Sequence, residues 1–252
     1  MMNSKKLTSC FFALSLGLFA QTASADFIGI KVGGGIWDHD VSGTVRYIDL
    51  VNVDLKNDLK LADEQDTFVY AVFEHPVPLI PNVKVSKSGL STSGSGVVST
   101  PFSYGGTTYN VSESISSKLV LDHQDVTAYF QILDNIVSLD IGITAKMLDG
   151  YVSITRSGVT SRNVISGTIP MIYGAVGVTI PLSGIYVGVE GSSLNIGDNE
   201  ISDITAKVVY KSALPFGIEG GIRDVSIKLD GLDAVTASMT FSGPFINLFL
   251  HF

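Results

Sequence analysis

The sequence predicts an all-β protein, a transmembrane antiparallel up-and-down β-barrel of about ten strands. Charged residues make up only 16% of the 252 residues and mean hydropathy is +0.36, whereas ordinary soluble domains are about 25% charged. No run of about 18 apolar residues occurs, which excludes transmembrane helices. Segments of about ten residues instead alternate between apolar and polar side chains, the pattern of a barrel with lipid outside and a polar lumen.

Composition excludes other classes. A net charge of −8 and a pI near 4.8 argue against nucleic-acid binding, which requires a basic surface. The apolar content of 45% excludes disorder. No sequence pattern indicates a cofactor, so none is expected.

Residues 1–25 read as a secretory signal peptide, and residues 26–252 as the barrel. Lys5 and Lys6 form the charged start, a short apolar stretch follows, and Ala23-Ser24-Ala25 is a cleavage site. The single cysteine, Cys10, lies in the removed segment, so the mature chain is expected to lack thiol chemistry.

The clearest strand covers residues 136–147. Val137, Leu139 and Ile141 share one face, while Asp140 and Lys146 lie on the other, where a soluble core would make them costly. The same division recurs at 185–193, at 216–224 and near the start. Together with charges on neighbouring strands it predicts a polar lumen network of Lys31, Asp140, Lys146, Glu190, Lys207, Lys211, Glu219 and Arg223. The mixed signs predict a lumen plugged by ion pairs rather than a charge-selective channel.

Short and long connections alternate along the chain. Turn residues predict tight connections at 75–82, 134–135, 181–184 and 212–215. Longer polar stretches at 38–66, 88–121, 149–164, 194–200 and 229–235 predict loops. Ten strands place both ends of the chain on one side, the periplasmic side in bacterial barrels; eight or twelve strands are the alternatives.

The chain closes with a strand that ends in a C-terminal Phe. Ile246, Leu248, Leu250 and Phe252 fall on one face. This pattern resembles the assembly signal of outer-membrane barrels, which predicts the barrel assembly machinery as a partner, with outer-membrane lipids and lipopolysaccharide around the wall.

Three passages carry a family resemblance. They are DFIGIKVGGGIW at 26–37 with Val41-Ser42-Gly43, FEHPVPLIPNV at 73–83, and the closing LHF at 250–252. Together they resemble a family of small outer-membrane β-barrel proteins of Gram-negative bacteria without an established activity. The resemblance covers the mature chain except loop 88–121. It implies fold and location, and it carries no catalytic residues.

One segment imitates a calcium loop. Oxygen-bearing Asp38, Asp40, Ser42 and Asp49 fall at loop positions 1, 3, 5 and 12, with Gly43 at position 6. Arg46 and the absence of flanking helices argue against it, and a polar strand end is the competing interpretation. Interleaved leucines between residues 50 and 61 indicate a short amphipathic helix over the barrel mouth.

The sequence favours a structural or surface-interaction protein of the bacterial outer membrane, not an enzyme, that acts through extracellular loops 38–66 and 88–121. One alternative is an outer-membrane hydrolase of lipid or peptide, with His39 or the Asp122–His123 pair as base. Another is a narrow solute channel. A soluble periplasmic barrel with an apolar interior and a polar exterior is a further alternative.

Overall fold

The computed structural model describes residues 28–47, 52–232 and 235–252. The predicted signal peptide and Asp49 lie outside these ranges. Fourteen strands are described: β1 Gly29–Tyr47, β2 Val53–Asp54, β3 Glu64–Glu74, β4 Asn82–Ser88, β5 Ser91–Val97, β6 Phe102–Tyr104, β7 Thr107–Tyr109, β8 Ser114–Asp134, β9 Val137–Arg156, β10 Val159–Ile180, β11 Ile185–Ile196, β12 Asn199–Lys211, β13 Phe216–Leu232 and β14 Val235–His251.

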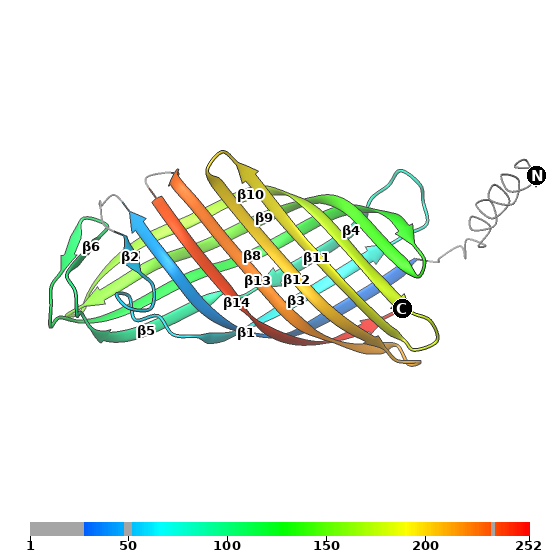
Figure 1. Ribbon diagram of the computed structural model, residues 1–252, viewed down its shortest axis with the longest axis horizontal. Helices are drawn as coiled ribbons and strands as arrows, with labels where there is room; N and C mark the ends of the chain where they lie inside the picture. The colour runs from blue at the N-terminus through cyan, green and yellow to red at the C-terminus, as the bar shows by residue number, and fades with distance from the viewer. Residues whose placement is uncertain (1–27, 48–51, 233–234) are drawn as a thin grey trace, which may run out of the picture.

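The strands close into a ten-strand antiparallel barrel, as predicted (Figure 1). Consecutive strands pair around the wall, and β14 pairs with β1 to complete the circle. β4 and β5 both pair with β8 and share one position in the wall. β2 pairs with β1 alone, and β6 and β7 form a separate hairpin. None of the described segments is a helix long and apolar enough to cross a membrane.

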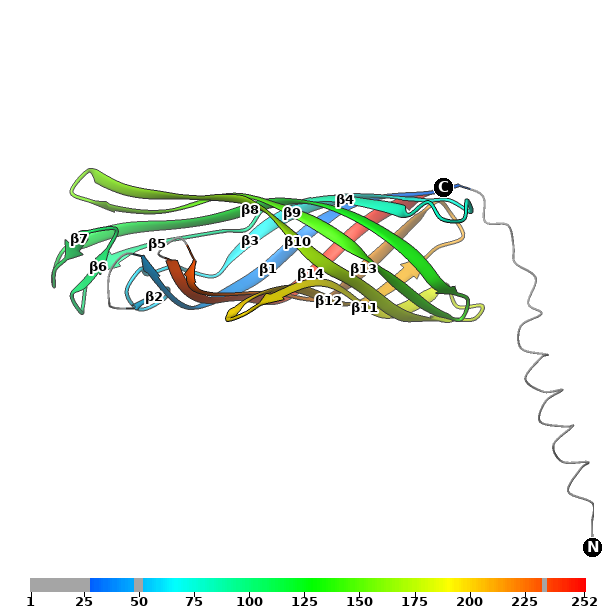
Figure 2. The same ribbon diagram turned by 90° about the horizontal axis from the view of Figure 1, so that it is seen from above.

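The start of β1, the C-terminal residue Phe252 and four short connections lie at one end of the barrel, here called the terminal end; the opposite end is the distal end (Figures 1 and 2). The connections at 181–184 and 212–215 have the predicted bounds, and those after β3 and β8 differ by one or two residues. The backbone of Phe252 exchanges two hydrogen bonds with Ile30, which closes the barrel seam at this end.

At the distal end the predicted long loops are mostly strand. β9 and β10 are separated only by Ser157 and Gly158, whose φ values of 49° and 79° match the tight hairpin turn typical of twisted strands. Most of predicted loops 194–200 and 229–235 is likewise strand: β11 ends at Ile196 and β12 begins at Asn199, and β13 extends to Leu232 while β14 begins at Val235. Polar composition does not prevent pairing, because each strand satisfies its neighbour's backbone groups whether or not lipid surrounds it.

The terminal half of the wall carries an apolar outer belt. Alternation along each strand turns the polar residues inward and leaves Val, Ile and Leu side chains exposed, the surface expected to face the lipid of a membrane. Every position in the wall contributes: Ile30 in β1, Val69 in β3, Val85 in β4, Val126 in β8, Ile141 in β9, Val176 in β10, Val187 in β11, Val208 in β12, Ile218 in β13 and Leu248 in β14.

The distal half has the opposite arrangement, an apolar interior. Val53 of β2 and Leu55, Leu59 and Leu61 of the turn and irregular segment that follows fold into it, in place of the expected amphipathic helix, and each is at most 3% exposed. They join a cluster with Trp37 and inward-facing residues of the distal strands. The distal half therefore resembles the soluble-barrel alternative, whereas the terminal half is its inverse.

Candidate functional site in the barrel lumen

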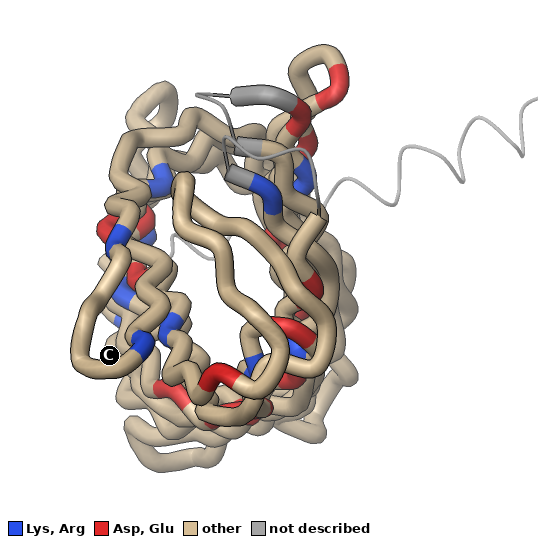
Figure 3. Tube along the Cα trace, turned by 90° about the vertical axis from the view of Figure 1, so that its left-hand side faces the viewer, with Lys and Arg blue, Asp and Glu red and all other residues tan. Residues whose placement is uncertain are grey.

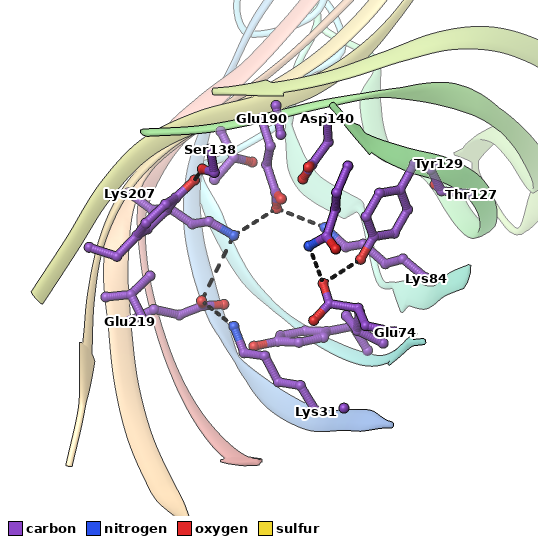
Figure 4. A pocket seen from close by; sticks show the side chains of 18 of the residues that line it. Lys31, Glu74, Lys84, Thr127, Tyr129, Ser138, Asp140, Glu190, Lys207 and Glu219 are labelled. Carbon is purple, nitrogen blue, oxygen red and sulfur yellow. Dashed lines mark hydrogen bonds and ion pairs between the residues drawn. The ribbon is translucent and has the colours of Figure 1, made fainter. Parts of the chain in front are cut away.

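The lumen of the terminal half contains a layer of ion pairs, here called the lower layer: Lys31, Lys84, Glu190, Lys207 and Glu219. Glu190 accepts from the Lys84 ammonium at 2.7 Å and pairs with that of Lys207 at 3.0 Å (Figure 4). Lys31 pairs with Glu219 at 3.1 Å. Because side chains alternate across a strand, these inward positions on β1, β4, β11, β12 and β13 converge on one level of the lumen.

Neutral groups complete the lower layer. The Asn247 amide donates to Glu219 and, at 3.2 Å, to the Tyr70 hydroxyl. The Lys31 ammonium lies 4.1 Å from the centre of the Phe249 ring, within the range of a cation–π contact. The layer thus braces β1, β3, β13 and β14 across the barrel seam.

An upper layer of ion pairs lies closer to the distal end: Asp125, Lys146, Asp203 and Arg223. Arg223 donates to both oxygens of Asp203 at 2.7 and 2.9 Å, a bidentate pair. Lys146 lies 2.8 Å from Asp125 and 3.0 Å from Asp203. Arg223 also donates to Ser88 and lies 4.8 Å from the centre of the Trp37 ring, so the upper layer touches the distal core.

The two layers bring together six of the eight residues predicted for the lumen: Lys31, Lys146, Glu190, Lys207, Glu219 and Arg223. Asp140 faces the lumen, but no ion pair is described for it, and its buried Oδ1 has no hydrogen-bond partner. Lys211 is exposed at the terminal end of β12, but it lines the lumen there, as predicted, without joining either layer. Charges of both signs are distributed around the wall (Figure 3).

Three members of the layers were not predicted: Lys84, Asp125 and Asp203. The alternation in β4 could have predicted that Lys84 faces the lumen, because Val83 and Val85 on either side of it lie on the opposite face. Asp203 likewise alternates with outward-facing Ile204 in β12.

A cavity of about 1180 Å³ occupies the terminal half of the lumen. It reaches the connections at the terminal end, where Asn135 and Gly184 line it, and it extends to Arg223 and Phe245 on the distal side. Tyr129 donates to Glu74 at 2.7 Å on its wall, near Asp140 (Figure 4). Beyond the cavity lies the apolar cluster of the distal half.

His39 is buried in the distal core rather than presented to solvent. Its Nε2 lies 3.0 Å from Asp66 Oδ2, and its ring centre lies 4.7 Å from that of Trp37 and 5.9 Å from that of Phe241. The nearby Ser91 hydroxyl donates to Asp66 and not to the imidazole. A nucleophile must reach its base directly, and in this arrangement the carboxylate stands between the two.

The predicted Asp122–His123 pair does not form, because neighbouring residues of β8 point to opposite faces. Asp122 accepts from the amide of Leu90 at 3.0 Å. His123 points into the lumen, where Arg223 donates to Nε2 at 3.1 Å and Nδ1 faces the carbonyl of Leu121 at 3.0 Å. A ring that accepts from a guanidinium carries its proton on Nδ1.

Asp49 lies outside the described residues, and the three described residues of the candidate calcium loop do not converge on one point. Asp38, Asp40 and Ser42 lie in β1, exposed on its outer face, where an extended chain spaces alternate side chains too far apart to surround one ion. Within the described residues, one group of His and Asp has metal-like spacing: His123, Asp125 and Asp203. Lys146 and Arg223 already neutralise the carboxylates of Asp125 and Asp203, so we interpret this group as part of the upper layer and not as a metal site.

The residues of the predicted assembly signal lie on the lipid-facing side of the terminal end. Ile246, Leu248 and Leu250 are 49–65% exposed and Phe252 is 71% exposed. Their recognition by assembly machinery stays a prediction.

No family model matches the sequence, and no curated protein matches it. Solved structures that resemble the chain include outer-membrane β-barrels of Gram-negative bacteria. The outer membrane protease OmpT from Escherichia coli gives a TM-score of 0.49 at 10% identity, over 93% of this chain and 99% of that chain. The transport unit of the autotransporter AIDA-I from Escherichia coli gives a TM-score of 0.41 at 10% identity, over 96% of this chain and 95% of that chain. The attachment invasion locus protein Ail of Yersinia pestis gives a TM-score of 0.38 at 10% identity, over 88% of this chain and 99% of that chain.

Proposed function

We propose that this protein is an integral outer-membrane barrel that is closed to through-passage and serves as a surface-interaction protein through its distal half. One observation carries the proposal: the cavity of the terminal half ends at the upper ion layer, and apolar side chains pack the lumen beyond it. A ten-strand barrel is also narrow compared with the barrels that conduct solutes freely.

In this proposal the terminal end faces the periplasm and the distal half stands outside the cell. The continuous apolar belt runs around the terminal half, whereas exposed apolar side chains such as Val164 are scattered among polar ones on the distal strands. The bilayer therefore surrounds the terminal half and leaves the outer face of the distal strands in water. Segments 38–66 and 88–121, which the sequence predicted to be extracellular loops, lie in this half. They contribute the turns that fold into the distal lumen and the β6–β7 hairpin.

The orientation is tested by inserting one epitope at either of two turns. Gly106, in the β6–β7 turn, has open space around it and a φ of 74°, so an insertion there disturbs little. Antibody is expected to label this epitope on intact cells, and an epitope at Ser183 only after permeabilisation. The reverse pattern would contradict the orientation.

Closure is tested by planar-bilayer recording of the purified barrel. The packed distal lumen predicts no steady conductance above that of a protein-free bilayer. A stable open level in the unmodified protein would contradict closure and favour the solute-channel alternative.

A further inference from the structure

The distal half contains two seams, where neighbouring strands stop pairing. At the first, β1 pairs with β3 only as far as His39, and the inserted segment 53–63 occupies the gap. The amide of Leu55 donates to Gly43 in β1 and that of Ala62 donates to Ser93 in β5, both at 3.0 Å. The first seam is therefore sealed by the chain itself.

The second seam, here called the β10 edge, comprises residues 159–171. β10 pairs with β9 along this whole stretch, but its pairing with β11 begins only at Ile172. The β9–β10 hairpin reaches farther toward the distal end than the β11–β12 hairpin (Figure 2). Within the described chain, no strand pairs with residues 159–171 on their second side.

The backbone groups that face this open side can be assigned. Thr179 donates to the carbonyl of Ile136 on the β9 side, and pairing with β9 continues without a bulge, so the odd-numbered residues of β10 face β9. The even-numbered residues then present amides and carbonyls to the open edge: Thr160, Arg162, Val164, Ser166 and Thr168. Pro170 follows in the same series, at a position where its missing amide breaks no bond to β9.

The core beneath the seam is incompletely covered. Ile165 and Ile169 of β10 and Leu194 of β11 pack against the distal apolar cluster but remain only partly buried. They flank the open edge. An added strand would hydrogen-bond the unpaired amides and carbonyls of the β10 edge and would also cover these three side chains.

We propose that the β10 edge is a docking site for an extended segment of another protein, which adds to the sheet as a strand and places an acidic side chain against Arg162. Strand addition gains affinity from main-chain hydrogen bonds and specificity from alternate side chains. Arg162 is exposed, its guanidinium lies 3.7 Å from the centre of the Tyr151 ring, and no carboxylate pairs with it within the described chain. The proposal rests on the outward orientation of the distal half given above.

A second copy in the same membrane fits this edge poorly. Two upright barrels are related by rotation about the membrane normal, and barrel strands tilt by about 35–45°. Their β10 edges would then cross at about twice that tilt, roughly 70–90°, instead of lying alongside each other. A separate extended segment has no such restriction.

The test is selection of random nine-residue displayed peptides on the intact barrel in detergent micelles. Val164→Pro removes an amide from the open edge without touching the β9 ladder, as Pro170 does naturally, and Val164→Thr is its matched control. Selected peptides are expected to bind the wild type and Val164→Thr within twofold, and Val164→Pro at least tenfold more weakly. They are also expected to carry Asp or Glu and to lose affinity for Arg162→Glu.

Peptides that bind Val164→Pro as well as wild type, or a selection without enrichment, would overturn the proposal. Disulfide crosslinking of Val164→Cys between two barrels, without peptide binding, would assign the edge to a second copy and overturn it as well. Epitope labelling and conductance decide the proposed function independently, because neither depends on position 164.

Discussion

At the scale of single residues, ion pairs join the strands across the lumen, and removal of one charged group leaves its partner buried without a counter-charge. Asp203 accepts from both Arg223 and Lys146 and is 9% exposed. Asp203→Asn is expected to lower the free energy of unfolding by about 3–5 kcal/mol, since two cations lose a buried counter-charge. Urea unfolding in detergent micelles measures the change.

Asp140→Asn is the matched control, because Asp140 also faces the lumen but no cation pairs with it in the described structure. Its effect is expected to stay within about 1 kcal/mol. Equal losses in both variants would contradict the bracing role of the upper layer.

Which face a residue occupies was predictable, but its partner was not. Alternation is local, so it placed Lys31, Glu190 and Glu219 in the lumen correctly. The pairs join distant strands: Lys84 and Glu190 are 106 residues apart, and Lys146 and Asp203 are 57 apart. The bracing geometry therefore emerges only when the barrel closes.

At the scale of elements, the inserted segment 53–63 depends on a glycine face of β5. A Cβ on Gly94 would lie 1.6 Å from the carbonyl oxygen of Lys60. Gly94→Ala is expected to displace the segment and increase acrylamide quenching of Trp37, the single tryptophan, in the same core cluster. Gly167→Ala, with open space around it, is the control and should leave quenching unchanged.

The same segment carries an ion pair that acidification breaks. The Lys56 ammonium, 2.7 Å from Asp63, and the amide of Val41 hold the pKa of that carboxyl below its ordinary value of 3.8. A lowered pKa in the folded state contributes stability that is present above about pH 4 and is lost as the pH falls through the folded-state pKa. Both side chains are nearly half exposed, so the contribution is small.

Lys56→Met is therefore expected to raise the pKa of Asp63 toward 3.8, followed by NMR titration of its carboxyl carbon. Lys60→Met is the control, because Lys60 donates to the carbonyl of Asn57 instead. An Asp63 pKa that does not move in Lys56→Met would show that the pair does not form.

Turns were predictable at this scale because proline, glycine and serine act locally, as at 181–184 and 212–215. Distal strands such as 149–156 were predicted as loops because their polar side chains lack the lipid-facing alternation. They are strands because neighbours pair with them.

At the scale of the whole molecule, one barrel combines a lipid-facing half with a half built like a soluble sheet. Val176→Arg, in the belt, is expected to cost about 2–4 kcal/mol of stability in lipid vesicles. Val164→Arg, on the same strand but in the distal half, should change stability by less than about 0.5 kcal/mol. Their side chains are 50% and 67% exposed, so only the surrounding medium distinguishes them.

The most direct test of the account is heat-modifiability on SDS gels of protein extracted from outer-membrane fractions. A closed barrel resists SDS while unheated and shifts in mobility on boiling. We expect this shift, together with extraction that requires detergent. A protein that shows no shift and is recovered in the soluble periplasmic fraction would contradict the membrane barrel.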